Sequence, residues 1–150
     1  MIDNPEAAHM MEPITAPNVQ PATETEGGQS LEFREENDVK VFEITTKAVQ
    51  WPILDDVTVT AYTYNGTVPG PMIRVTEGDQ VRVIVADDGR GFRFHGHYDH
   101  ATLAEMKLGP VTLKERIVSL GGSLSIDSSE SGARLEIVLP VARAEDRDGD

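Results

Sequence analysis

The hydrophobic pattern of this chain changes its period near residue 85, and this change limits the fold more than any other feature of the sequence. Before it, β-branched and aromatic residues dominate, and Val57, Val59 and Ala61 alternate with polar residues as in a half-buried strand. After it, apolar residues recur at helical spacing. The pattern therefore predicts a first half that is all β and a second half that is α+β.

Turn residues divide the first half into short strands. The turn signals are Asn65-Gly66, Pro69-Gly70-Pro71 and Glu77-Gly78-Asp79. The strands expected between them are the stretch 39–44, the alternating stretch 57–62, Met72–Val75 and Gln80–Val85.

The second half contains one helix followed by two strands. Pro110 is expected at the first helical position, where a proline loses no hydrogen bond, and Gly121-Gly122 is expected to end the helix. Leu113, Ile117 and Leu120 have helical spacing between these signals. The two strands are expected around residues 124–126 and 135–139, with residues 128–132 as a hairpin loop.

Composition excludes several classes of function. The chain has 26 acidic against 13 basic residues, a formal charge of −13, so no nucleic acid or anionic membrane is expected as a partner. It has no cysteine, which excludes disulfides, thiolate metal sites and cysteine nucleophiles. No apolar run approaches the ~18 residues of a membrane helix. No signal peptide precedes Arg34, so a cytoplasmic location is expected.

The motif from Ala61 to Pro71, Ala-Tyr-Thr-Tyr-Asn-Gly-Thr-Val-Pro-Gly-Pro, is followed by Ile73-Arg74-Val75 and by Glu77-Gly78-Asp79-Gln80-Val81-Arg82-Val83. With these elements in this order, residues 38–85 resemble the first cupredoxin domain of multicopper oxidases. The resemblance implies part of a Greek-key β-sandwich and an oxidoreductase kinship, and proteins of this family are usually exported. The turns are scaffold elements in the family and bind no ligand.

The same resemblance implies copper, because the family's ligands arrive in a His-x-His motif after the Glu-Gly-Asp turn. His95-Gly96-His97 lies near that position, with His100 close by, so His95 and His97 are the candidate copper ligands. The alternative interpretation is that they are solvated loop histidines. A blue-copper centre is excluded because it needs a cysteine thiolate.

A second resemblance begins at the change of period. The sequence Val85-Ala86-Asp87-Asp88-Gly89-Arg90-Gly91-Phe92, with the helix and strands after it, makes residues 81–141 resemble the end of a histidine-kinase ATPase domain of the nitrate-sensor type. This resemblance implies ATP and Mg²⁺ as ligands. Asp87 would accept the adenine amino group, and Gly89 and Gly91 would let the backbone approach the nucleotide. The alternative for this motif is an ordinary turn.

The kinase pattern is incomplete. The second glycine box is reduced to Leu108-Gly109-Pro110-Val111, and the expected positions of the magnesium-binding helix and the phospho-accepting helix hold other sequence. Val81–Val85 fits the strand pattern of both families, so the join between them is expected there. Each half is incomplete, so Leu135, Ile137 and Leu139, like Val57, Val59 and Ala61, are expected to lack a packing partner.

The expected organisation is a disordered acidic tail at 1–30, a cupredoxin-like segment at 31–85, an ATPase-like segment at 81–141 and a charged tail at 142–150. Three functions stay open: a cupredoxin-type module with copper at His95 and His97, an ATP-binding remnant of a two-component kinase at Asp87, Gly89 and Gly91, and a non-functional composite. Whether the chain is an enzyme is open, because both sites are incomplete. Its protein partners and oligomeric state are not predicted.

Overall fold

The computed structural model describes residues 19–22 and 27–143. The expected tails at 1–30 and 142–150 therefore lie mostly outside the described residues. The described elements, in chain order, are β1 (Phe33–Glu36), β2 (Val39–Leu54), β3 (Val57–Tyr64), β4 (Gln80–Ala86), β5 (Gly96–Tyr98), α2 (His100–Glu105), α3 (Val111–Ser119), β6 (Ser123–Ser129) and β7 (Gly132–Pro140). A mainly β chain with one sheet and two short helices agrees with the expected fold class at this coarse level.

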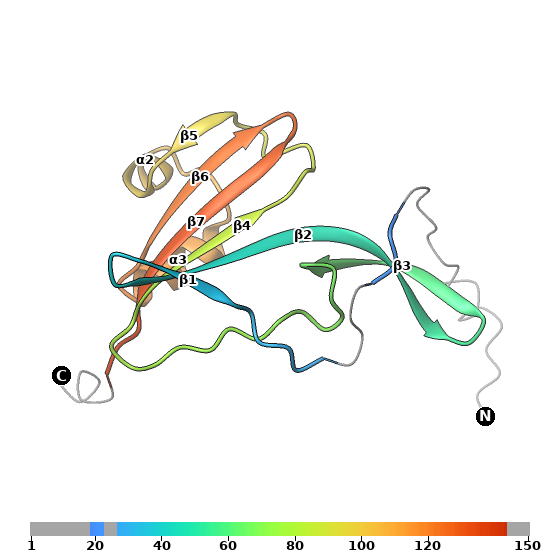
Figure 1. The fold of residues 1–150 in the computed structure, drawn as a ribbon. Helices are drawn as coiled ribbons and strands as arrows, with labels where there is room; N and C mark the ends of the chain where they lie inside the picture. The colour runs from blue at the N-terminus through green and yellow to red at the C-terminus, as the bar shows by residue number, and fades with distance from the viewer. Residues whose placement is uncertain (1–18, 23–26, 144–150) are drawn as a thin grey trace, which may run out of the picture.

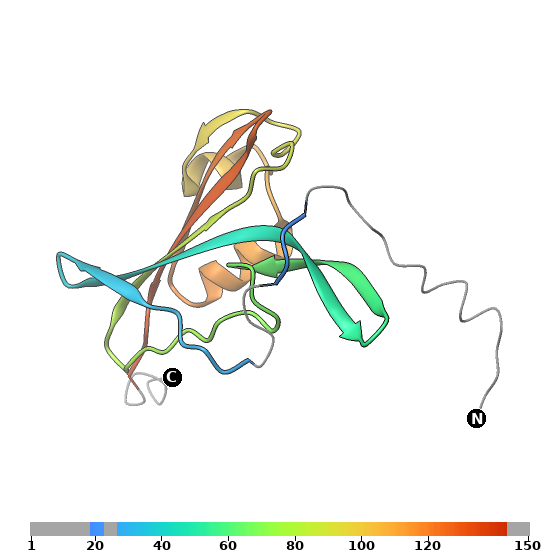
Figure 2. The same cartoon turned by 45° about the vertical axis from the view of Figure 1, so that its right-hand side comes forward.

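The described strands form a seven-stranded sheet in the order β1-β2-β4-β7-β6-β5, with β3 added to the far part of β2. Strand β4 pairs parallel with residues 39–45 of β2 and antiparallel with β7, so both expected halves meet on it. Beyond residue 45, β2 pairs with β3, and this hairpin extends away from the rest of the sheet (Figure 1). Figure 2 shows the same projection after a 45° turn.

Three local expectations are corrected by the structure. Met72–Val75 is not a strand, because Met72 makes only an isolated bridge to Ser30. β1 and α2 were not expected. α2 is one and a half turns long and is capped by Asp99, whose carboxylate accepts the Thr102 N–H at 2.8 Å.

Both helices cover the same face of β6 and β7 (Figures 1 and 2). The buried cluster on this face joins one side chain from each helix to two from β6, namely Leu103, Ile117, Leu124 and Ile126. Leu135, Ile137 and Leu139 of β7 pack against this cluster. The expectation that these three lack a partner is therefore wrong, because α2 and α3 supply the layer that the sequence pattern left incomplete.

The expected end of α3 is confirmed. The helix stops at Ser119, and Gly121 follows with φ of 71°, a conformation that a glycine adopts without strain. Pro110 is the N-cap residue of α3 and not its first helical residue, so the helix begins one residue later than expected.

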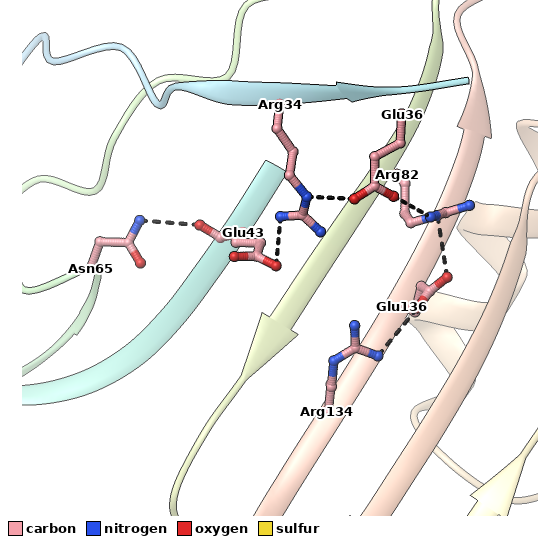
Figure 3. Close-up of polar contacts among 7 residues, drawn as sticks. All are labelled: Arg34, Glu36, Glu43, Asn65, Arg82, Arg134 and Glu136. Atoms are coloured by element: carbon pink, nitrogen blue, oxygen red, sulfur yellow. Dashed lines mark hydrogen bonds and ion pairs between the residues drawn. The ribbon is translucent and has the colours of Figure 1, made fainter. Parts of the chain in front are cut away.

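On the opposite face of the sheet, a ladder of alternating charges crosses β2, β1, β4 and β7 (Figure 3). Its contacts are ion pairs of 2.6 to 3.3 Å. The members, in order along the ladder, are Glu43, Arg34, Glu36, Arg82, Glu136 and Arg134. The hydrogen bond from Arg34 holds the pKa of Glu36 below its ordinary value. The ladder therefore links strands of the first half to a strand of the second.

Two of the three motif turns of the first half are bound to β2 by side-chain hydrogen bonds. Asn65 accepts the Thr45 N–H at 2.7 Å and donates to the Glu43 carbonyl at 3.3 Å, a contact drawn in Figure 3. Asp79 accepts from Lys40 Nζ and from the Thr76 N–H, each at 2.7 Å. These contacts agree with the scaffold role expected for the turns.

Candidate functional site

Asp87 lies directly after β4, where the chain leaves the sheet. Its N–H donates to the Ala133 carbonyl at 2.9 Å, which extends the pairing of β4 with β7 by one residue. Its carboxylate is exposed, and Oδ1 accepts the Gly89 N–H at 2.8 Å. Within the described part of the chain, no partner is recorded for Oδ2, so this oxygen can accept a hydrogen bond from a ligand.

The two glycines of the Asp87–Gly91 motif, Gly89 and Gly91, differ in how closely the chain packs around them. Gly91 has φ of 69°, and a Cβ placed there would lie 2.2 Å from the Ser129 carbonyl oxygen. The loop is held against the β6–β7 hairpin at this point, since the Phe92 N–H donates to Ser128 Oγ at 2.8 Å. A Cβ on Gly89 would meet only the Asp87 Oδ1 atom at 3.0 Å. Packing within the chain therefore accounts for Gly91 without a nucleotide.

An open cavity of about 280 Å³ lies beside the Asp87 carboxylate and is lined from both halves of the chain. Asp87, Asp88 and Gly89 come from the loop after β4. β2 and β3 contribute the remaining lining residues, Thr46, Lys47, Ala48 and Tyr62. Neither Lys47 nor Tyr62 was predicted as a site residue from the sequence. Tyr62 pairs with Ala48, the neighbour of Lys47, across the β2–β3 hairpin, and the sequence alone does not give this register.

The three histidines near residue 97 are not gathered into a metal site. His97 Nδ1 lies 2.8 Å from Asp127 Oδ1 across the β5–β6 pair. His100 Nδ1 accepts the Leu124 N–H at 3.2 Å. The carbonyl of His95 accepts from the Tyr98 hydroxyl at 3.0 Å, and no contact of the His95 ring with His97 is recorded among the described residues.

The residues present do not fit a copper centre of the oxidase type. Among the described residues, no group of three or more His, Cys, Asp or Glu side chains could hold a metal ion, and the whole chain lacks the thiolate of a blue-copper site.

The reduced glycine box is part of the helix packing. Gly109 has φ of 79°, and a Cβ there would lie 3.1 Å from the Ile126 side chain. Lys114 of α3 donates to the carbonyls of Leu103 and Leu108, which closes the connection between α2 and α3. The Lys114 ammonium group is therefore bound to the chain's own carbonyl groups.

Comparison with protein families matches residues 45–110 to the multicopper oxidase model. The match covers less than half of the 150 residues and includes β3, β4 and the His95–His97 segment. Multicopper-oxidase-type sequence is therefore present in this segment, as the first resemblance implied. The match runs past residue 85, where that resemblance was expected to end.

A multicopper oxidase from Campylobacter jejuni, described as a metallo-oxidase, is a solved structure similar to this chain. The two share 18% sequence identity with a TM-score of 0.47, over 87% of this chain and 25% of that one. The chain thus spans about a quarter of the length of that protein, and a TM-score of 0.47 is too low to assign the fold. No curated protein matches significantly. None of these matches is to a histidine kinase, so that resemblance stays a prediction.

No helix among the described residues is long and apolar enough to cross a membrane.

Proposed function

We propose that this chain joins a multicopper-oxidase-type β segment to the end of a histidine-kinase-type ATPase domain, and that it acts as a binding module without completed catalysis. Its ligand is an adenine nucleotide, bound weakly beside Asp87. In this proposal the oxidase-type hairpin contributes walls to the site and has no redox function.

One observation carries the proposal: the cavity lined by Asp87, Tyr62 and Lys47 contains three groups that match two parts of a nucleotide, its base and its phosphates. The Asp87 carboxylate can accept the amino group of adenine. The ring of Tyr62, whose residue is 89% exposed, can stack on the base, since every base has a π-face. The Lys47 ammonium group can pair with a phosphate.

The kinship to an ATPase domain is supported by the order of elements. Asp87 follows a strand, and the chain continues through α3 to the β6–β7 hairpin, with β7 pairing back on β4. The strand–helix–strand–strand order that the second resemblance implied is thus β4, α3, β6 and β7, with β5 and α2 inserted between β4 and α3. The hydrogen bond from the Asp87 N–H to the Ala133 carbonyl fixes the motif at the end of that sheet.

Weak binding follows from three properties of the site. The cavity is open and its volume of about 280 Å³ is at the lower end for ligand pockets. The position expected for the magnesium-binding helix of the ATPase family holds other sequence. The chain's charge of −13 repels a polyphosphate. With most charge-assisted phosphate contacts missing, we expect a dissociation constant of about 1 mM.

The test is an NMR titration of the ¹⁵N-labelled chain with ATP and, separately, with GTP. ATP should shift the amide signals of residues 46–48 and 87–89, and GTP should bind at least about fivefold more weakly because guanine offers no amino group at the adenine position. Asp87→Asn should abolish the preference for ATP. Asp88→Asn is the matched control: it removes the same charge beside the same cavity and should keep the preference.

Two results would contradict the proposal. One is the absence of amide shifts in these segments at about 10 mM ATP, about ten times the expected dissociation constant. The other is tight copper(II) binding, with submicromolar affinity lost in His97→Ala, which would favour the oxidase interpretation over the nucleotide one.

A further inference from the structure

We propose that the ligand bound beside Asp87 is an adenine nucleoside monophosphate and not a triphosphate, and that its ribose lies in a second cavity walled by residues 19–21. This proposal rests on the proposed function, because it names the ligand of that same site. Its basis is the position of the two cavities and the charge of the side chains that line them.

A larger cavity of about 570 Å³ adjoins the one at Asp87. The two share five lining residues from β2 and from the loop after β4, namely Thr46, Lys47, Ala48, Asp87 and Asp88. The smaller cavity, of about 280 Å³, is at the lower end of the volumes of ligand pockets, whereas the larger one lies well within that range. A base in the smaller cavity therefore leaves the larger one for the sugar attached to it.

One wall of the larger cavity is formed by a segment that precedes β1 in the chain. Val19, Gln20 and Pro21 line the cavity there. The segment pairs in parallel with β2: the Gln50 N–H donates to the Gln20 carbonyl at 2.8 Å, and the Ala22 N–H donates to the Gln50 carbonyl at 3.0 Å. Figure 2 shows the segment, in blue, beside β2. Backbone hydrogen bonds therefore hold this wall against the sheet.

The charge of the lining limits the number of phosphates that the site can accept. Asp87 and Asp88 line both cavities, and Lys47 is the only cation among the lining residues that the structure describes. The Lys47 ammonium group can pair with one phosphate. The further phosphates of a triphosphate would lie near the two carboxylates, and the chain's charge of −13 adds to this repulsion. A monophosphate therefore fits the lining better than a triphosphate.

The hydroxyl groups of a ribose find acceptors in the shared lining. Asp88 is exposed beside both cavities, and a carboxylate is a usual acceptor for ribose hydroxyls. The Thr46 hydroxyl donates to the Ala86 carbonyl at 3.4 Å, so its oxygen can still accept a hydrogen bond. With Asp87 for the base and Lys47 for the phosphate, each part of a nucleoside monophosphate has a polar partner.

NMR titration of the ¹⁵N-labelled chain with AMP and, separately, with ATP tests the proposal, at low salt and without magnesium. AMP should bind at least about fivefold more tightly than ATP, with a dissociation constant of about 0.2 mM or less. Added salt should reduce this ratio, because it screens the repulsion of the extra phosphates. AMP should also shift the amide signals of Ala22 and Gln50, whose hydrogen bonds hold the wall of the second cavity.

Two matched variants separate the local charge of the site from the net charge of the chain. Asp88→Asn removes one carboxylate from the lining, so it should strengthen ATP binding, weaken the ribose contact and lower the ratio of the AMP and ATP affinities at least about threefold. Glu105→Gln makes the same change of charge at an exposed position of α2, and the ratio should stay within about 1.5-fold of the original.

ATP binding that is as tight as AMP binding, or tighter, overturns this proposal and leaves the proposed function standing. AMP shifts at residues 46–48 and 87–89 without any shift at Ala22 or Gln50 overturn it too, because the second cavity is then not used. So does an equal effect of Asp88→Asn and Glu105→Gln on the ratio. If neither AMP nor ATP shifts any of these amides at about 10 mM, the proposed function itself is contradicted, and this proposal is refuted with it.

Discussion

Replacing Gly91 by alanine separates a packing role of this glycine from a ligand-binding role. The residue has φ of 69°, where a side chain costs about 1 kcal/mol, and its new Cβ would lie 2.2 Å from the Ser129 carbonyl oxygen. Relieving such an overlap by backbone movement costs about a further 1–3 kcal/mol. Gly91→Ala should therefore destabilise the ligand-free chain by about 2–4 kcal/mol, which at about 1–2 kcal/mol per M lowers the urea midpoint by about 1–2 M or more.

Gly89→Ala is the control within the same motif. Gly89 has no positive φ, and its new Cβ would meet only a side-chain oxygen that can move. Its urea midpoint should change by less than about 0.5 M, which corresponds to less than about 1 kcal/mol. Both variants are measured without nucleotide by circular dichroism. If the two glycines tolerate alanine equally well, the packing argument for Gly91 is refuted and close approach to a ligand becomes the better explanation.

Three further predictions concern the buried core, the Lys40–Asp79 contact and the charge ladder. Ile126 of β6 is fully buried in the cluster with Leu103 and Ile117 of the helices. Ile126→Ala should therefore lower the free energy of unfolding, measured with urea, by about 2–5 kcal/mol. A loss of less than about 1 kcal/mol would show that this face is not tightly packed. The hydrogen bond from Lys40 holds the pKa of Asp79 below its ordinary value, so Asp79→Asn should lower the melting temperature at pH 7. The pKa of Asp79 is lower in the folded chain than in the unfolded chain. The difference in melting temperature between the original chain and Asp79→Asn should therefore shrink as the pH falls below about 4 toward the folded-state pKa. A difference independent of pH would contradict this role of Asp79. A double-mutant cycle on Arg82 and Glu136 should give a coupling free energy of about 0.5–1 kcal/mol, and added salt should reduce it. A coupling free energy of zero would show that this ion pair does not stabilise the fold.

Local signals in the sequence predicted several elements correctly. Gly121 marked the end of α3, and Val81–Val85 marked a strand on which the two halves of the sheet meet. The Asp79 and Asn65 turns were expected to be scaffold, and the structure gives each of them hydrogen bonds to β2. The helix end depends on a local φ angle, whereas the hydrogen bonds of Asn65 and Asp79 join residues 20 and 39 positions apart.

Partners distant in the sequence were not predictable in the same way. Met72–Val75 has a strand-like composition, yet it makes only one bridge, from Met72 to Ser30. The pairing of His97 with Asp127 joins residues thirty positions apart, and no spacing rule indicates it. For this reason only part of the cavity lined by Asp87 and Lys47 was predicted. Asp87 belongs to a recognisable motif, whereas Lys47 lies at the cavity because of the path that β2 takes in the sheet.

The position of β4 between β2 and β7 has a consequence for how the chain folds as it is synthesised. β4 ends at Ala86, but its antiparallel partner begins only at Gly132, so forty-five residues lie between them. Until β7 has been made, β4 carries an open edge, and contacts of such large sequence separation form slowly. A nascent chain in this state exposes unpaired strand to its neighbours. Slowing translation between residues 86 and 132 should therefore lower the soluble yield, whereas slowing it after residue 140 should not.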